Sequence, residues 1–281
     1  MSVNLKGKID IIGRTDEGQV RDHNEDFISD NSTLGIAVLA DGMGGLNAGE
    51  VASSMTVHLL MEELIAFRLG DSPLEAELAN GEDDLPIEAR VVRKAVEKAN
   101  DAVFHTSQTQ PQCKGMGTTV VASLFYDNKV AIAHIGDSRV YLFRGGKLDQ
   151  VTKDHSFVQE LIDKGLYTKE EARTSDKKNV VTRALGVQPF VEVECHEYDT
   201  QVGDIYLMCS DGLHDMVTDR DIERAFIELG GNLKELASYL VELANANGGK
   251  DNVSVILTRV VKSTATEERS GLFERIANWF E

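Results

Sequence analysis

The sequence predicts an α+β fold in which stacked antiparallel sheets are flanked by helices. Short apolar runs, often β-branched and bounded by Gly, Asp or Asn, are typical of strands. Two longer stretches place apolar residues at helical spacing instead. Because strands and helices come in groups and do not alternate strictly, stacked antiparallel sheets are favoured over a parallel doubly wound sheet.

The expected strands spread over most of the chain and stop at residues that favour turns. A strand is expected to begin at Phe27, directly after a polar segment that contains Asp22, Glu25 and Asp26. The other expected strands cover residues 9–12, 34–40, 118–125, 130–135, 140–143, 205–209 and 253–260.

A pair of long helices is expected after the second group of strands, over residues 48–69 and 86–105. The acidic segment 70–85 contains Gly, Pro and Asn, so it is interpreted as a solvated connection between them. The apolar stripe of the first helix is expected to contain Val51, Met55 and Leu59, flanked by Leu60 and Leu64.

Later helices carry start signals, in which a Ser, Thr, Asp or Asn cap is followed three residues on by an acidic residue. Three pairs fit this pattern: Thr168 with Glu171, Thr218 with Asp221, and Asn232 with Glu235.

Length and composition predict one domain with a large core and a short tail. The chain has 281 residues, 42% of them hydrophobic, with 24 Gly and only 4 Pro. The domain is expected to cover residues 1–262, and a linker with a short amphipathic helix residues 263–281. One face of that helix is expected either to pack on the protein's own core or to dock onto a partner. Its members are Leu272, Phe273, Ile276, Trp279 and Phe280.

Charge and cysteine usage exclude several classes of function. The formal net charge of −18 argues against nucleic-acid binding, which depends on Lys and Arg, and suits divalent cations or simple solubility. The cysteines Cys113, Cys195 and Cys209 are odd in number and widely spaced, which supports neither a disulfide framework nor a zinc site. With no apolar run long enough to cross a membrane, the protein is expected to be cytoplasmic.

Aspartates recur at the ends of the expected core strands. Asp41, Asp137 and Asp211 each follow such a strand beside glycine or another turn residue, and Asp251 precedes one. Each alone has a simple interpretation as a turn residue. Gathered at one edge of a rigid sheet, however, the carboxylates would repel one another by about 4 kcal/mol per close pair at an effective dielectric near 20, and so recruit cations. Oxygen ligands select magnesium, manganese or calcium.

A carboxylate cluster of this kind predicts chemistry with water as the nucleophile. Two cations can activate a water and clamp the oxygens of an in-line phosphoryl displacement. Arg21 is the candidate for phosphate binding, because its guanidinium can donate two hydrogen bonds to two oxygens. A cysteine phosphatase and a P-loop enzyme are excluded, since neither motif occurs.

The motifs together resemble the type 2C family of metal-dependent protein phosphatases, bacterial branch, over roughly residues 13–260. The matching segments, in the family's order, are Arg21-x-x-Asn24-Glu25-Asp26, Asp41-Gly42-Met43-Gly44-Gly45, Gly115-Met116-Gly117-Thr118-Thr119, Gly136-Asp137-Ser138-Arg139, Asp154-His155-Ser156, Ser210-Asp211-Gly212 and Asp251-Asn252. The resemblance implies a four-layer α-β-β-α sandwich with two central antiparallel sheets and a flap subdomain at about residues 153–183.

The resemblance also implies roles for single residues. Asp41 would bridge two Mn²⁺ or Mg²⁺ ions, the Gly42 carbonyl would bind one of them, and Asp211 with Asp251 would hold the other. Glu25 and Asp26 would act through metal-bound waters. Asp137, together with Asp211, would help to bind a third, weaker ion, although a turn cap is the alternative for Asp137.

The activity that the resemblance implies is hydrolysis of phosphoserine and phosphothreonine in proteins, which reverses phosphorylation by a Ser/Thr kinase. The kinase is itself an expected partner. At the position of Met43, many eukaryotic members have a histidine that is the proposed general acid. Because methionine cannot donate a proton, a metal-bound water is the preferred general acid in this chain, and His23 is the alternative. Two other functions are weighed: a noncatalytic phosphoprotein-binding module, and a metal-dependent phosphodiesterase, which should show a basic track.

Overall fold

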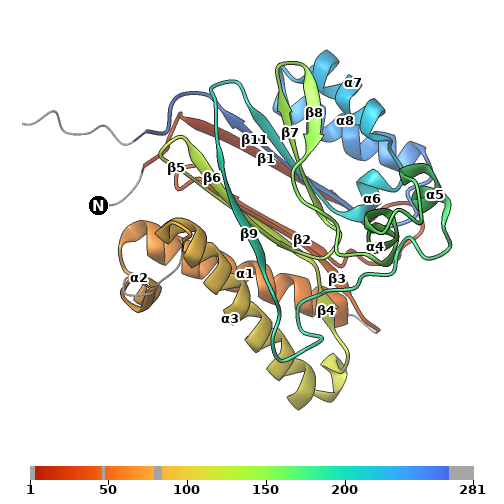
Figure 1. Ribbon diagram of the computed structural model, residues 1–281, viewed down its shortest axis with the longest axis horizontal. Coiled ribbons are helices and arrows are strands. Elements are labelled where there is room, and N and C mark those ends of the chain that lie inside the picture. The colour runs from red at the N-terminus through yellow and green to blue at the C-terminus, as the bar shows by residue number, and fades with distance from the viewer. Residues whose placement is uncertain (1–3, 46–47, 79–83, 266–281) are drawn as a thin grey trace, which may run out of the picture.

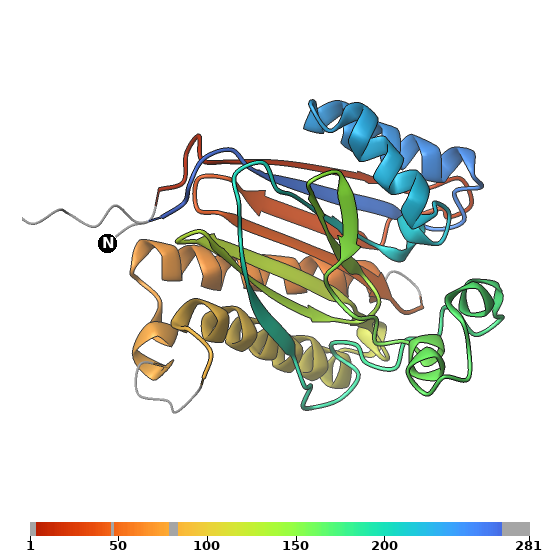
Figure 2. The same ribbon diagram turned by 45° about the horizontal axis from the view of Figure 1, so that its top comes forward.

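The computed structural model describes residues 4–45, 48–78 and 84–265, and these form four layers (Figure 1). Two antiparallel sheets lie face to face in the centre, with helices on the outer face of each (Figure 1 and Figure 2). The α+β prediction is therefore confirmed. The stripe predicted for residues 263–281, from Leu272 to Phe280, lies outside the described residues.

The first sheet has the strand order β1-β11-β10-β7-β8. All of its ladders are antiparallel. Its strands are β1 (Ile9–Asp16), β11 (Val253–Val260), β10 (Ile205–Cys209), β7 (Arg139–Arg144) and β8 (Lys147–Gln150).

The second sheet has the order β2-β3-β5-β6-β9, and a short strand β4 pairs with β3. These ladders are also antiparallel. The strands are β2 (Asp26–Asn31), β3 (Ile36–Met43), β5 (Val120–Tyr126), β6 (Lys129–Ile135), β9 (Glu194–Asp199) and β4 (Gly117–Thr118).

The helices cover the outer faces and one end of the sandwich. On the second sheet lie α1 (Ala48–Leu69), α2 (Pro73–Leu78), α3 (Ile87–Thr109) and the 3₁₀ turn η1 (Pro111–Cys113). On the first lie α6 (Asp211–His214), α7 (Asp219–Leu229) and α8 (Leu233–Ala246). The flap contains α4 (Phe157–Asp163) and α5 (Lys169–Thr174).

Alternation along the central strands explains the layers. In β3, Ile36, Val38 and Ala40 face α1 and α3, whereas Ala37 and Leu39 point into the core between the sheets. In β10, Leu207 faces the α7–α8 layer and Met208 the inter-sheet core. Strands buried on both faces read as continuous apolar runs, which is why these strands were predicted from the sequence.

The predicted helix start signals are confirmed in detail. Thr168 and Glu171 form a reciprocal capping box at the start of α5. The Thr218 hydroxyl accepts a hydrogen bond from the Asp221 backbone N–H, and Asn232 does the same for Glu235. Each cap satisfies a backbone donor that the first turn of a helix leaves free.

Two predictions about the helices are wrong. The segment 70–85 is not only a connection, because it contains α2. The buried face of α1 follows Ala52, Thr56, Leu60 and Leu64, one position on from the predicted stripe. The predicted stripe begins at Val51, which is 37% exposed. Apolar residues of α1 extend beyond its buried face, so the sequence alone allowed the wrong face to be chosen.

The strand β9 was not predicted, because its sequence ECHEYD is mostly polar. It is the edge strand beside β6, and the backbone ladder of that neighbour holds it in place. A polar edge strand of this kind carries little hydrophobic pattern of its own.

Candidate metal centre

Four of the predicted metal ligands come from both sheets and meet at one end of the sandwich. Asp26 begins β2 and lies opposite Asp41 of β3 in the ladder. Asp211 follows β10 as the first residue of α6, and Asp251 comes just before β11. Because β10 and β11 are antiparallel neighbours, the end of one lies beside the start of the other. The fifth acid, Asp137, sits in the turn from β6 to β7, where the chain passes between the sheets.

The carboxylates of the cluster act on one another electrostatically. Without bound cations, burial raises the pKa of Asp41 well above its usual range, and the negative charges of Asp26 and Asp211 raise it further. Burial also raises the pKa of Asp211, and the negative charges of Asp137 and Asp251 raise it further. Like charges held in a low-dielectric environment disfavour ionisation of one another, so the cluster requires positive charge to stay ionised.

Asp26 and Asp137 are the two most enclosed acids of the group, at 5% and 6% exposure. Burial raises the pKa of Asp26 to about 6 and that of Asp137 to about 7. Asp26 Oδ2 accepts a hydrogen bond from Ser210 Oγ at 2.8 Å, whereas Asp26 Oδ1 is buried with no hydrogen-bond partner among the described residues. A buried oxygen without a partner is costly unless a cation or an ordered water satisfies it.

The donor chemistry of the cluster fits a hard divalent cation. All of its side-chain donors are carboxylate oxygens, the ligands that Mg²⁺ and Mn²⁺ prefer. Gly42 is tightly enclosed beside them, since an added Cβ would lie 2.2 Å from the Gly49 carbonyl oxygen. Its N–H donates to the Glu25 carbonyl oxygen at 3.1 Å, which helps to hold the residue whose own carbonyl the sequence nominated as a ligand.

The glycine-threonine motif at Gly117–Thr118 and the next residue fixes the backbone of Asp41. The Asp41 N–H donates to Thr119 Oγ1 at 3.1 Å, and the Asp41 carbonyl accepts from the Thr119 N–H at 2.8 Å and from Thr118 Oγ1 at 2.8 Å. These bonds hold the residue predicted to bridge two cations, so the motif has a positioning role that the sequence did not reveal.

Asn252 joins the two halves of the cluster. Its Oδ1 accepts from the Glu25 N–H at 2.8 Å, and its Nδ2 donates to the carbonyls of Glu17 at 3.0 Å and His23 at 2.8 Å. The segment that carries Arg21, Glu25 and Asp26 is thereby tied to the residue next to Asp251. His23 contributes its carbonyl to this network, and its side chain is exposed.

Arg21 contacts the cluster through Asp251, a partner that was not expected from the sequence. Its Nη2 donates to Asp251 Oδ2 at 2.7 Å, and this hydrogen bond raises the pKa of Arg21. The side chain remains 49% exposed. The guanidinium therefore reaches a predicted cation ligand and keeps part of its donor set open to solvent.

A family model described as protein phosphatase 2C matches residues 15–251 of the chain. The chain belongs to the protein phosphatase 2C family. It is a metal-dependent protein serine/threonine phosphatase, so the sequence-based expectation is confirmed.

Relatives of this phosphatase are found in several bacteria. The serine/threonine phosphatase stp of Listeria monocytogenes is 38% identical over 247 residues, which cover 87% of this chain and 93% of that protein. Stp1 from Staphylococcus aureus has a crystal structure that matches with a TM-score of 0.80 at 32% identity, covering 92% of this chain and 97% of that one. The PstP catalytic domain, crystallised in complex with two manganese ions, matches with a TM-score of 0.76 at 38% identity, covering 90% and 99% of the respective chains.

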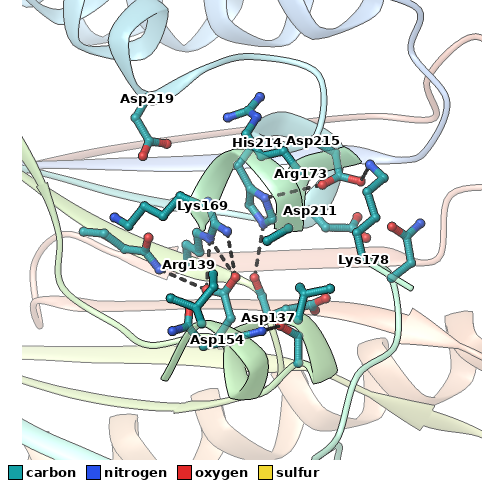
Figure 3. A pocket seen from close by; sticks show the side chains of 17 residues that line it. Asp137, Arg139, Asp154, Lys169, Arg173, Lys178, Asp211, His214, Asp215 and Asp219 are labelled. Atoms are coloured by element: carbon teal, nitrogen blue, oxygen red, sulfur yellow. Dashed lines mark hydrogen bonds and ion pairs between the residues drawn. The ribbon is translucent and has the colours of Figure 1, made fainter. Parts of the chain in front are cut away.

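The flap of the phosphatase closes a pocket beside Asp137 and Asp211 (Figure 3). Arg139 holds Asp154 there through three hydrogen bonds of 2.7 to 3.1 Å, and Lys178 of the flap pairs with Asp215. His214 lies within hydrogen-bond distance of the Asp137 carbonyl, 3.1 Å from its Nε2. These contacts between distant segments were not predicted from the sequence.

A second group of potential ligands, His134, His155 and Glu194, brings its ligand atoms within 4.8 Å of one another. His155 Nδ1 accepts a hydrogen bond from the Gly136 N–H at 3.1 Å, so the proton of the neutral ring lies on Nε2. That nitrogen lies 3.2 Å from Glu194 Oε2 and donates to it. A cation could bind this nitrogen only if the ring lost that proton. The group is therefore a hydrogen-bonded cluster that supports the start of the flap, and not a metal site.

The described residues contain no helix long and apolar enough to span a membrane.

Proposed function

We propose that the phosphatase hydrolyses phosphoserine and phosphothreonine at the end of the sandwich where Asp26, Asp41, Asp211 and Asp251 converge. The observation that carries this proposal is the cluster itself: carboxylates from two sheets share one site, Asp26 Oδ1 is buried there without a hydrogen-bond partner among the described residues, and like charges raise the pKa of Asp41 and Asp211. Two Mn²⁺ or Mg²⁺ ions would be held by Asp41, the Gly42 carbonyl, Asp211 and Asp251, and Glu25 and Asp26 would act through water. When bound, the cations supply an activated water and neutralise charge on the phosphoryl group.

The residues of the chain contribute rigidity and orientation. Thr118 and Thr119 hold the Asp41 backbone, and Asn252 holds the segment of Arg21 and Glu25 against the start of β11. Residues whose backbone is held in this way need little reorganisation as the substrate reacts, and such preorganisation is a main source of catalytic power in polar sites.

Arg21 is proposed to bind the phosphate of the substrate. Its guanidinium already lies on Asp251 while half of the side chain stays exposed. A planar fork of N–H donors can hold a carboxylate on one edge and phosphate oxygens on another. Arg21 would therefore orient the phosphoryl group relative to the carboxylate cluster.

The acid that protonates the leaving alkoxide is proposed to be a water and not a side chain. Met43 has no proton to donate, and His23 is exposed and bound to the cluster only through its carbonyl. A third, weaker cation site at Asp137 with Asp211 is also proposed, because the charges of both residues raise the pKa of Asp41, and the charge of Asp137 also raises the pKa of Asp211. The physiological substrates are proposed to include a Ser/Thr protein kinase.

The test is phosphate release from a phosphothreonine peptide with manganese, with EDTA, and with the Asp211→Ala variant. We expect turnover that requires manganese and falls by at least about a thousandfold in the variant, equivalent to about 4 kcal/mol of transition-state stabilisation. A folded, manganese-loaded wild type that releases no phosphate would contradict the proposal and favour a noncatalytic binding module.

A further inference from the structure

The flap differs in charge from the rest of the chain. Residues 153–183 contain seven Lys and Arg against six Asp and Glu, a net charge of +1, whereas the whole chain carries −18. In an acidic protein, a locally basic segment beside the catalytic pocket is a candidate for contact with an anionic ligand.

Most of the cations of the flap have partners. Lys153 pairs with Asp163 at 2.7 Å, Lys164 with Glu160 at 3.7 Å, and Arg183 with Glu192 at 3.3 Å. Lys177 lies over the Phe157 ring, 5.0 Å from its centroid, and Lys178 pairs with Asp215. These five residues are accounted for by contacts within the protein.

Lys169 and Arg173 are different, since neither has a hydrogen bond or an ion pair to any residue in the described part of the chain. Both are exposed and both belong to α5, where a spacing of four residues places them on one face of the helix. Both line the pocket that also contains Asp137 and Asp211, and Figure 3 shows them around it. Two free cations therefore face the edge of the proposed active site.

The other charges of this pocket are largely neutralised within the protein. Arg139 pairs with Asp154 through both carboxylate oxygens, and Lys178 pairs with Asp215. Asp219 is exposed and keeps its negative charge, and its carboxylate accepts a hydrogen bond from the Tyr141 hydroxyl at 3.1 Å. Asp137 and Asp211 belong to the proposed cation cluster. Among the described residues that line this pocket, the cations left to meet a ligand are Lys169 and Arg173.

We propose that Lys169 and Arg173 form a subsite for an acidic side chain of the substrate, a carboxylate or a second phosphate, close in sequence to the residue being dephosphorylated. This inference rests on the proposed function. The pocket has a water-accessible volume of about 140 Å³ and adjoins the acid cluster, so a bound peptide can reach both places at once. Substrates with neighbouring acidic or phosphorylated residues are thereby preferred over neutral ones.

The test is a set of phosphothreonine peptides that differ at one other position, scanned from three residues before to three residues after the target. At each position the residue is Ala, Glu or phosphoserine, and kcat/KM for release from phosphothreonine is measured with manganese, using product mass to assign the site of cleavage. We expect an acidic residue to raise kcat/KM by roughly five- to tenfold at one or more positions, since one exposed charge pair changes an equilibrium by up to about fivefold. The effect acts mainly on KM and shrinks as salt rises.

For each variant, kcat/KM for the acidic peptide is divided by kcat/KM for the neutral peptide. This ratio is compared with the wild-type ratio, so a change in overall rate cancels. We expect the ratio to fall to about one in Lys169→Ala/Arg173→Ala and below one in Lys169→Glu/Arg173→Glu, by the same charge-pair reasoning. The matched control is Lys164→Ala, which removes an exposed flap cation that lies outside the pocket and is paired with Glu160. That variant should keep the wild-type ratio.

A second readout does not depend on turnover. Fluorescence anisotropy of labelled, unphosphorylated peptides with Glu or Ala at the preferred position should show tighter binding of the Glu peptide to wild type, and no difference for the double alanine variant.

The outcomes separate the two proposals. If no peptide releases phosphate with manganese, the proposed function fails. If the peptides are hydrolysed but no position prefers an acid, or if the preference survives in the double alanine variant, the subsite is overturned while the phosphatase activity stands. A phosphoserine preference without a Glu preference would restrict the subsite to phosphate.

Discussion

The two ends of β10 each carry an aspartate beside the strand, and their surroundings are opposite. At one end, Asp204 is 2% exposed and accepts two hydrogen bonds from Arg144, at 2.8 and 2.6 Å, and one from the Gln201 N–H at 2.7 Å. At the other end, the Asp211 carboxylate has no hydrogen-bond or ion-pair partner in the described part of the chain, and the charges of Asp137 and Asp251 act on it.

The contrast shows how to separate structural from functional acids within one fold. A carboxylate that the chain itself neutralises, such as Asp204, contributes to stability. A carboxylate held among like charges is unfavourable for the folded chain alone, so it is explained by a cation that the chain does not provide. The first two predictions below test this distinction, and the third tests a buried histidine beside the flap.

The largest expected effect concerns cation-dependent stability. At 100 times its Kd, a cation that binds only the folded state adds about 2.7 kcal/mol. For a domain of this size, that energy raises Tm by roughly 5–10 °C. We expect Mn²⁺ to produce such a shift in wild type, and Asp211→Asn to lose most of it while being at least as stable as wild type in EDTA, because one like charge is gone.

Thermal unfolding monitored by circular dichroism, with Mn²⁺ or EDTA, measures both quantities. Asp204→Asn is the matched control at the opposite end of the same strand, and it should keep the manganese shift. An Asp211→Asn protein that is clearly less stable than wild type in EDTA would mean that Asp211 stabilises the chain by itself, and the distinction would be lost.

The second effect concerns the neutralised end of β10. Asp204→Asn leaves Arg144 without its carboxylate and weakens three hydrogen bonds, so the free energy of unfolding should fall by about 1–3 kcal/mol. The partial exposure of Arg144, at 36% of its side chain, limits the loss because water can solvate the guanidinium. Urea denaturation in EDTA measures this change. An unaltered free energy of unfolding would show that the ion pair contributes nothing.

The smallest effect is a pH dependence at the base of the flap. Burial and the adjacent His134 lower the pKa of His155 to about 4, against 6.5 for an ordinary histidine, although Glu194 opposes the shift and Arg183 favours it. Between these values the unfolded chain binds a proton that the folded chain excludes, so stability is lost as pH falls from about 6.5 towards 4.

His155→Gln should therefore reduce the slope of unfolding free energy against pH in this window, whatever its effect on stability at neutral pH. Urea denaturation from pH 4.5 to 7 in EDTA gives the slopes, and Lys164→Ala should leave the slope as in wild type. Equal slopes for wild type and His155→Gln would show that His155 is protonated to the same extent in both states.

Local patterns predicted the fold where the local signal was strong. The helix over residues 48–69 was predicted with the observed bounds, and the three capping pairs were correct, because a cap is a short-range hydrogen bond. The polar strand β9 and the short helix α2 were missed, because the neighbouring elements stabilise them more than their own sequences do.

The candidate site divides in the same way. The sequence pattern alone was enough to select the four aspartates that lie next to the ends of core strands, namely Asp41, Asp137, Asp211 and Asp251. The contact of Arg21 with Asp251 and the network of Asn252 join segments about 230 residues apart, and no local rule predicts them.

The sequence by itself determined which residues are acidic, apolar or capping, and so which family, fold class and chemistry the chain has. Only the tertiary structure decided which acids remain without partners and which cations of the flap face them. The physical reason is that charge neutralisation depends on distance in space: Asp204 and Asp211 are similar residues at the ends of one strand, and their neighbours from other strands make one structural and the other a candidate ligand.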